Sequence, residues 1–261
     1  MIFMRKLAAL LRTALVHTTT YRAEMLLWAL SGSMPIILMG VWFQAAKAGS
    51  LEYSPLEMVR YFVAVLVIRQ LTMVWVIWEF EESVVRGRLS HDLLRPIDPV
   101  WHYLANHLAE RIARFPAVLG LVFLCFWLYP GSAYFPGWLV LAQAAALILG
   151  SFVTRFALQY TLATVCFYNE RASSLESLSF IAYTFLSGML APLDLYPPIV
   201  QQIAAWTPFP YLIFAPARLL IGEKVDVFAT FQVLGAWTCG LIVLQRWAWK
   251  KGLSRYSAMG A

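Results

Sequence analysis

Charged residues are scarce in this sequence. Only 13% of its 261 residues are Asp, Glu, Lys or Arg, whereas 61% are hydrophobic. Soluble domains contain about 25% charged and about 45–50% apolar residues, so a soluble fold of this length has too little interior for this much apolar surface. The composition therefore predicts an all-α integral membrane protein whose spanning helices each use about 20 apolar residues.

Cysteine is also rare, and an excess of acidic charge is absent. The three cysteines, Cys125, Cys166 and Cys239, all lie in apolar stretches, which argues against a disulfide framework. The formal net charge is +6, from 20 basic and 14 acidic residues. In a membrane protein this balance indicates basic cytoplasmic loops beside anionic lipid head groups, so no nucleic-acid partner is expected.

Motifs for catalysis and metal binding are missing. The sequence contains no G-x-x-x-x-G-K-[ST] phosphate-binding loop, so no ATP site is expected in this chain. No H-E-x-x-H occurs, and His102 and His107 are five residues apart, which places them on different helix faces and argues against a shared metal. Solvated loop histidines are the simpler interpretation. Arg88 and Arg95-Pro96 are spaced as in the basic first motif of lipid-phosphate phosphatases, with His91 and His102 as candidate histidines. Arg88 stands where those enzymes use Lys, and their further motifs are absent. We expect no catalytic residue, no metal site and no cofactor in this chain.

Long apolar runs predict six transmembrane helices. An amphipathic segment at 1–22 has the leucine spacing of a helix that lies in the membrane interface. A proline-rich but apolar stretch at 192–227 indicates external re-entrant helices, and a polar stretch at 79–114 indicates a cytoplasmic loop. The expected spans are 25–46, 56–78, 115–129, 138–167, 175–190 and 228–247.

The distribution of Lys and Arg predicts the orientation. With the N-terminus inside, the inner segments carry fourteen basic residues and the outer segments three. This bias predicts that both termini lie in the cytoplasm. The expected location is the cell (inner) membrane, which the chain crosses several times.

Two arginines fall near the middle of predicted spans. Arg69 lies about halfway along 56–78, and Arg155 about halfway along 138–167. Ionisable residues at this depth are costly and often functional, so a substrate path is one interpretation. A satisfied helix–helix contact or snorkelling to the interface is the other.

The predicted inner loop at 79–114 combines charges of both signs with a pair of adjacent leucines and two prolines. It holds Leu93–Leu94, Pro96 and Pro99, and the charged residues Glu81, Glu82, Arg86, Arg88, Asp92 and Arg95. This combination suits a surface that docks another protein, although charge that only sets orientation explains the same composition.

Three stretches resemble the type-2 ABC exporter permeases whose ATPase is a separate chain. Gly87-Arg88-Leu89 through Leu93-Leu94-Arg95-Pro96-Ile97-Asp98-Pro99 is similar to the cytoplasmic G-x-L-D-x-L-L-x-x-P-x-D-P region of that family, with His91 where an acidic residue is common. Ser187–Pro216 resembles its external region, and the ending Arg255-Tyr256 to Gly260-Ala261 resembles its R-Y-x-x-x-G-G tail. The three stretches occur in the family's order along the whole chain.

The resemblance implies a fold and a set of partners. It implies six spans with a short coupling helix between spans two and three, a second permease subunit of the same or a related kind, and two copies of an ATPase that binds ATP and Mg. Glu81, Glu82, Arg86, Arg88, Asp92 and Arg95 are the residues expected to contact the ATPase. A hydrophobic or amphiphilic cargo, drug-like or lipid-linked, suits the apolar composition. The alternative is an ion-coupled or passive membrane transporter without an ATPase.

Overall fold

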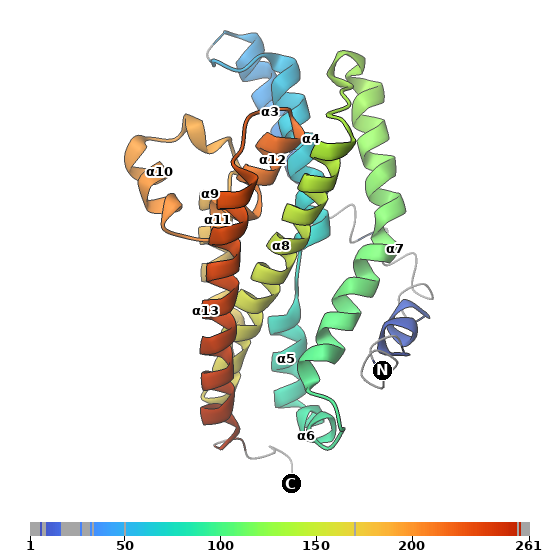
Figure 1. The fold of residues 1–261 in the computed structure, drawn as a ribbon, viewed down its shortest axis with the longest axis vertical. Helices are drawn as coiled ribbons and strands as arrows, with labels where there is room; N and C mark the ends of the chain where they lie inside the picture. Colours follow the sequence, from blue (N-terminus) through green and yellow to red (C-terminus); the bar gives the residue numbers. More distant parts are fainter. Residues whose placement is uncertain are drawn as a thin grey trace.

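The computed structural model describes residues 6, 9–16, 27, 32, 34–49, 51–169, 171–254 and 256, and over these residues it is helical without a strand. Long helices run side by side along the length of the molecule (Figure 1). In chain order the elements are α3 (Met34–Lys47), α4 (Pro55–Thr72), α5 (Val76–Val85), α6 (Arg88–Leu93), α7 (Pro99–Leu128), η1 (Pro130–Ser132), α8 (Trp138–Ala163), η2 (Thr164–Phe167), α9 (Ser173–Leu186), η3 (Leu193–Leu195), α10 (Pro198–Ala205), α11 (Phe209–Leu212), α12 (Phe214–Leu220) and α13 (Val227–Leu253).

Four stretches of helix within the described residues are long and apolar enough to cross a membrane. They are Pro55–Val85, Pro99–Leu128, Trp138–Phe167 and Val227–Leu253. The expected span 175–190 overlaps the shorter helix α9. The expected span 25–46 overlaps α3 from residue 34 onward, and its first part lies largely outside the described residues. The prediction of a helical membrane protein agrees with this fold, whereas six spans and re-entrant helices stay predictions.

Local sequence signals explain where three of the long helices begin. Ser54 and Glu57 form a reciprocal capping box at the start of α4, with Pro55 at the first helical position. Asp98 caps α7 by accepting a hydrogen bond from the backbone N–H of Val100. Asp226 accepts from the N–H of Ala229 in the same way at the start of α13.

The polar stretch 79–114 is not a loop, which corrects the sequence interpretation. It contains the second half of α5, all of α6 and the first half of α7, which begins at Pro99 rather than near residue 115. Charge density suggested a loop, but much of that charge is buried and paired inside α7, so the helix continues through it. The predicted second span is also interrupted, because the backbone leaves the helix at Met73–Trp75 between α4 and α5.

Two other expected segments are described in part. The stretch 192–227 holds the short elements η3, α10, α11 and α12, and α10 projects from the side of the bundle (Figure 1). The expected interfacial helix 1–22 falls largely outside the described residues, although residues 9–16 are helical.

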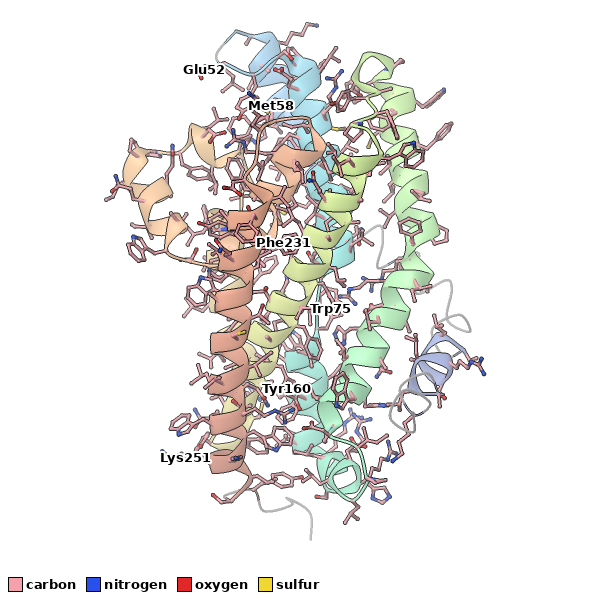
Figure 2. All side chains as sticks on the ribbon, viewed as in Figure 1. Glu52, Met58, Trp75, Tyr160, Phe231 and Lys251 are labelled. Atoms are coloured by element: carbon pink, nitrogen blue, oxygen red, sulfur yellow. The ribbon has the colours of Figure 1, made fainter. Side chains whose placement is uncertain are left out.

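The core is divided into two clusters along the length of the bundle. One surrounds α4, with Met58, Phe62 and Ile213 fully buried. The other is aromatic and centres on Phe80 of α5, whose ring lies 5.5–6.1 Å from the rings of Tyr103, Tyr160, Phe167 and Trp249. Phe80 therefore ties α5 to α7, α8, η2 and α13. Glu52 and Lys251 mark the two ends of the molecule, with Trp75 and Tyr160 between them (Figure 2).

Candidate functional site

The candidate site is the α5–α6–α7 turn at one end of the bundle, here called the α6 end. Gly87 connects α5 to α6 with φ = 70°, a left-handed conformation that glycine adopts without strain. The short helix α6 therefore stands where the family resemblance implies a coupling helix. Beside it lies a cavity of about 650 Å³, whose lining includes Glu82, Arg86, Arg88, Asp92 and Arg95 together with His91, His102 and Asn106.

The charged residues of this cavity pair with one another at the surface. Glu82 forms ion pairs with Arg86 at 2.9 Å and with Arg88 at 3.1 Å. Arg95 pairs with Asp92 at 3.2 Å. The three arginine side chains are between 54% and 67% exposed. Exposed pairs of this kind contribute only about 0–1 kcal/mol to folding, so the charges remain available for a partner.

The adjacent leucines Leu93 and Leu94 have different environments in the structure. Leu93 packs against the aromatic cluster around Phe80. Leu94 is 84% exposed at the tip of the α6 end. A leucine that projects this far beside paired charges is a feature of a contact surface, where a buried apolar centre is surrounded by a polar rim.

Glu81 differs from the other five predicted contact residues. One carboxylate oxygen accepts hydrogen bonds from the backbone N–H groups of Ala172 and Ser173, each at 2.8 Å. The other lies 3.3 Å from the Ser173 hydroxyl, which donates to it. The side chain thus caps the first turn of α9 and joins α5 to that helix. Its contact with an ATPase stays a prediction.

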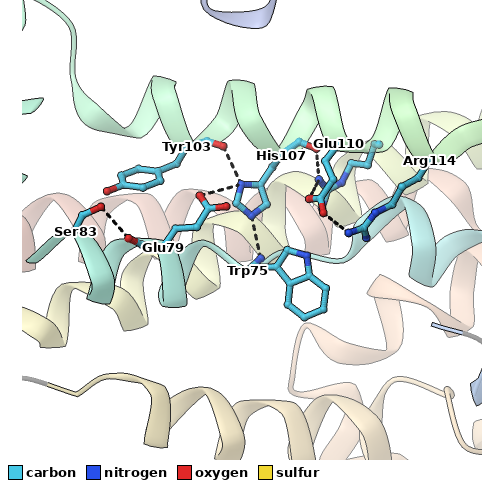
Figure 3. A network of polar contacts seen from close by, with 8 residues as sticks. Trp75, Glu79, Ser83, Tyr103, His107, Glu110 and Arg114 are labelled. Atoms are coloured by element: carbon cyan, nitrogen blue, oxygen red, sulfur yellow. Dashed lines mark hydrogen bonds and ion pairs between the residues drawn. The ribbon is translucent and has the colours of Figure 1, made fainter. Parts of the chain in front are cut away.

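A buried polar network lies where α4 and α5 separate, and it was missed from the sequence (Figure 3). His107 of α7 is fully buried, which corrects its interpretation as a solvated loop residue. Its Nε2 accepts a hydrogen bond from the backbone N–H of Trp75 at 2.9 Å, and its Nδ1 lies 2.9 Å from the Tyr103 carbonyl oxygen. Nδ1 must therefore carry the proton and donate it to Tyr103, which defines a neutral tautomer.

Arg111 holds the other side of the same break. Its Nε donates to the carbonyl oxygen of Leu71 at 3.0 Å, and Nη1 donates to that of His107. Arg114 forms an ion pair with Glu110 one turn earlier on α7. Arg111 and Arg114 are 8% and 3% exposed, so they are not the solvated loop charges that the sequence suggested.

Residues His107 and Arg111 together fix α7 to the backbone on both sides of the α4–α5 break. His107 accepts from the N–H group of Trp75, and Arg111 donates to the carbonyl group of Leu71. The interruption of the helix leaves both backbone groups without a helical hydrogen bond. Unpaired backbone groups are expensive in an apolar interior, so these side chains make the break tolerable. Their spacing of four residues on one helix face was the signal available in the sequence.

Replacing His107 should destabilise this junction. We expect His107→Phe to lower stability by about 1–3 kcal/mol, because the Trp75 N–H loses its acceptor. His107→Gln keeps an acceptor near the Nε2 position and should retain part of that stability. Thermal unfolding of the two variants in lipid nanodiscs measures the difference. Equal unfolding temperatures for the Phe variant and the wild type would contradict this role.

The two mid-span arginines have different surroundings. Arg69 donates from Nη1 to the carbonyl oxygen of Gly32 at 2.8 Å, a helix–backbone contact of the structural kind. Arg155 places its guanidinium carbon 3.9 Å from the centroid of the Tyr183 ring. It also borders a small cavity between α8 and α9. A role of either arginine in a substrate path stays a prediction.

Comparison with known proteins gives one family. Residues 30–260 match the family model described as ABC-2 family transporter protein. No curated protein matches the chain.

Proposed function

Since the chain belongs to the ABC-2 transporter family, and is thus a membrane permease subunit of an ABC transporter, we propose that it forms the substrate path of an ATP-driven exporter. The ATPase is a separate chain, and it binds ATP and Mg. It docks on the α6 end, where Glu82, Arg86, Arg88, Asp92 and Arg95 surround the 650 Å³ cavity.

The observation that carries this proposal is the composition of the α6 end. An exposed leucine, Leu94, stands among ion pairs that contribute little to the fold. A partner that covers this surface buries the leucine and gains complementary contacts with charges of both signs. Charge needed only for membrane orientation requires neither a short projecting helix nor an exposed apolar tip.

The packing behind α6 supports transmission of force from the ATPase. Phe80 fixes α5 in the aromatic cluster with α7, α8 and α13. Glu81 fixes α5 to the start of α9. A displacement of α6 is therefore transmitted through Phe80 and Glu81 of α5 to α7, α8, α9 and α13.

The working assembly has two permeases, identical or related, and two ATPase copies. Closure of the ATPase pair on ATP shifts the permeases between inward-facing and outward-facing packings. The cargo is hydrophobic or amphiphilic, and the protein lies in the inner cell membrane in contact with its lipids.

Purification from native membranes tests this function. The tagged chain should bring with it a protein that carries a phosphate-binding loop and hydrolyses ATP. Cargo should stimulate that hydrolysis when the complex is in nanodiscs. Transport by the purified chain alone, driven by an ion gradient and indifferent to ATP, would support the ion-coupled or passive alternative instead.

The topology provides a separate prediction. A reporter fused after Ala261 should be cytoplasmic, and one inserted near Gly49 should be external, because the predicted inner segments carry fourteen basic residues and the outer segments three. Protease access to tags at the two positions in sealed vesicles measures this. An external C-terminus would refute the orientation on which ATPase docking depends.

A further inference from the structure

A separate cavity of about 330 Å³ lies in the half of the molecule away from α6 (Figure 1). Its walls come from η3, α10, α11, α12 and the segment that leads into α13. This volume is within the range of about 300–1,000 Å³ that is typical of small-molecule sites. Apolar and aromatic side chains form part of the lining, and its charged members are Asp194, Arg218, Lys224 and Asp226. The formal charges of the lining therefore sum to zero.

The opposite charges of this lining do not neutralise one another directly. Among the described residues, Lys224, Asp194 and Asp226 form no ion pair, although all three line the same cavity. The Asp194 carboxylate accepts a hydrogen bond from the neutral Tyr53 hydroxyl at 2.7 Å. One oxygen of Asp226 accepts from the backbone N–H of Ala229. Neutral donors leave a carboxylate its negative charge, so the cavity presents uncompensated charge of both signs.

Arg218 is held at the cavity wall by two contacts. Its Nε donates to the carboxylate of Glu223, with which it forms an ion pair. Its guanidinium carbon lies 5.3 Å from the centroid of the Phe214 ring. Within the described structure its two terminal nitrogen atoms have no hydrogen bond. They are therefore available, like the Lys224 ammonium, to donate to an anionic group in the cavity.

Helix α10 relates the cavity to the membrane surface. It lines the cavity with Gln201 and Ala205, which lie on one face of the helix. Ile199 and Ile203 lie on the opposite face with Trp206, which follows the last residue of α10, and each exposes more than half of its surface. The helix projects from the side of the bundle (Figure 1). An exposed apolar face with a tryptophan is typical of a helix in the membrane interface, which places the cavity behind it near the depth of lipid head groups.

We propose that this cavity binds a zwitterionic head group that carries a phosphate and an ammonium. The phosphate contacts Lys224 and Arg218, and the ammonium contacts Asp194 or Asp226. An ion of one sign is attracted by one pair of side chains and repelled by the other, whereas a zwitterion meets both pairs with opposite charge. The inference goes beyond the proposed function, because it depends on neither the ATPase nor the cargo.

The lipid selectivity of the full chain tests this proposal. The delipidated protein in detergent receives equal amounts of phosphatidylethanolamine, phosphatidylglycerol and ethylphosphatidylcholine with the same acyl chains. These lipids are zwitterionic, anionic and cationic respectively, and native mass spectrometry quantifies the bound fraction of each. The wild type should bind phosphatidylethanolamine about tenfold more tightly than either of the others, the effect of one charge-assisted hydrogen bond.

A soluble competitor distinguishes a membrane lipid from a free head group. Glycerophosphoethanolamine has the same phosphate and ammonium but no acyl chains. If it displaces phosphatidylethanolamine at equal concentration, the ligand is the free compound. If the lipid stays bound, the ligand is the phospholipid, which the exposed apolar face of α10 favours. Both results support the zwitterionic site.

Removing charge of one sign should redirect the selectivity. Lys224→Gln leaves the acidic side chains in excess, so the cationic lipid should bind at least as well as phosphatidylethanolamine. The double variant Asp194→Asn with Asp226→Asn leaves the basic side chains in excess, so phosphatidylglycerol should be preferred. Asparagine still offers an acceptor to Tyr53 and is a good N-cap for α13, so the double variant keeps these structural contacts.

Matched controls make the same chemical changes outside the cavity. Lys47→Gln and Glu52→Gln alter exposed residues that do not line it, and both should retain the selectivity of the wild type. A wild type without a preference for phosphatidylethanolamine, or cavity variants with the selectivity of the wild type, would overturn the proposal. Failure of ATPase co-purification bears on the proposed function alone, since the lipid measurement does not involve the ATPase.

Discussion

The double variant with Glu82→Lys and Arg88→Glu is expected to insert normally in the membrane but to lose its ATPase. The exchange keeps opposite charges at positions 82 and 88, where Nη2 of Arg88 now lies 3.1 Å from Oε2 of Glu82. It changes no net charge. Arg86 then faces a like charge instead of its present partner at 2.9 Å, an exposed contact whose loss costs about 1 kcal/mol or less.

A docked partner experiences the exchange very differently. Charges that become desolvated on docking and meet a hydrogen-bonding partner contribute about 1.5–3 kcal/mol each. Reversing two of them replaces attraction by repulsion at both positions. Co-purification of the ATPase should fall to background, and cargo-stimulated hydrolysis should disappear.

The same exchange at the opposite end of the molecule provides the control. Lys47→Glu with Glu52→Lys also reverses two exposed charges and keeps the net charge. Helix α3, which ends at Lys47, lies at the end of the molecule opposite α6 (Figure 1), and Glu52 lies at that same end (Figure 2). This control should retain the ATPase. Full export by the Glu82→Lys, Arg88→Glu variant would refute docking on these residues. It would favour the alternative of an ion-coupled or passive transporter without an ATPase.

The sequence was most informative about helices and least informative about charged groups inside them. Apolar run length predicts α8 with η2 and α13 closely, because burial in lipid depends on composition over about 20 residues. The cap formed by Asp98 and Pro99 was present in the sequence, yet the charge around Arg111 and Arg114 suggested a loop. Glu110 and Arg114 pair within α7 at a spacing of four residues, which is a local helix signal. Arg111 bonds to the backbone of Leu71, 40 residues away along the chain, and that partner leaves no local pattern.

Site residues followed the same division. The exposure of charged residues such as Arg86 and Arg95 could be predicted from the local charge pattern, whereas their contact with an ATPase stays a prediction. The bonds of Glu81 and His107 could not be predicted in this way. Glu81 bonds to the backbone of Ser173 on α9, and His107 bonds to that of Trp75 in the break between α4 and α5, and both partners are distant along the chain. The break between α4 and α5 has no proline or glycine to mark it, and His107 and Arg111 explain it only once α7 is placed beside it.

Replacing Glu81 should leave ATPase binding intact but impair the coupling of ATP hydrolysis to transport. We expect Glu81→Ala to retain ATPase co-purification, because the exposed pairs at Glu82, Arg88 and Arg95 are unchanged. It should lose coupling of hydrolysis to transport, because the first backbone N–H groups of α9 lose their shared acceptor. That loss costs about 1.5–3 kcal/mol and removes the negative charge that favours a helix N-terminus. A weakened junction lets α5 move without α9.

Two measurements on the reconstituted complex decide this assignment. The first is the amount of ATPase bound per permease, and the second is the amount of cargo moved per ATP hydrolysed. Glu81→Gln keeps one acceptor oxygen for the N–H groups of Ala172 and Ser173, so its coupling should lie between the wild type and the Ala variant. If Glu81→Ala instead releases the ATPase as the charge exchange at Glu82 and Arg88 does, Glu81 contacts the partner directly. In that case the link from α5 to α9 plays no part in transmission, and the aromatic cluster around Phe80 remains as the route from α6 to the bundle.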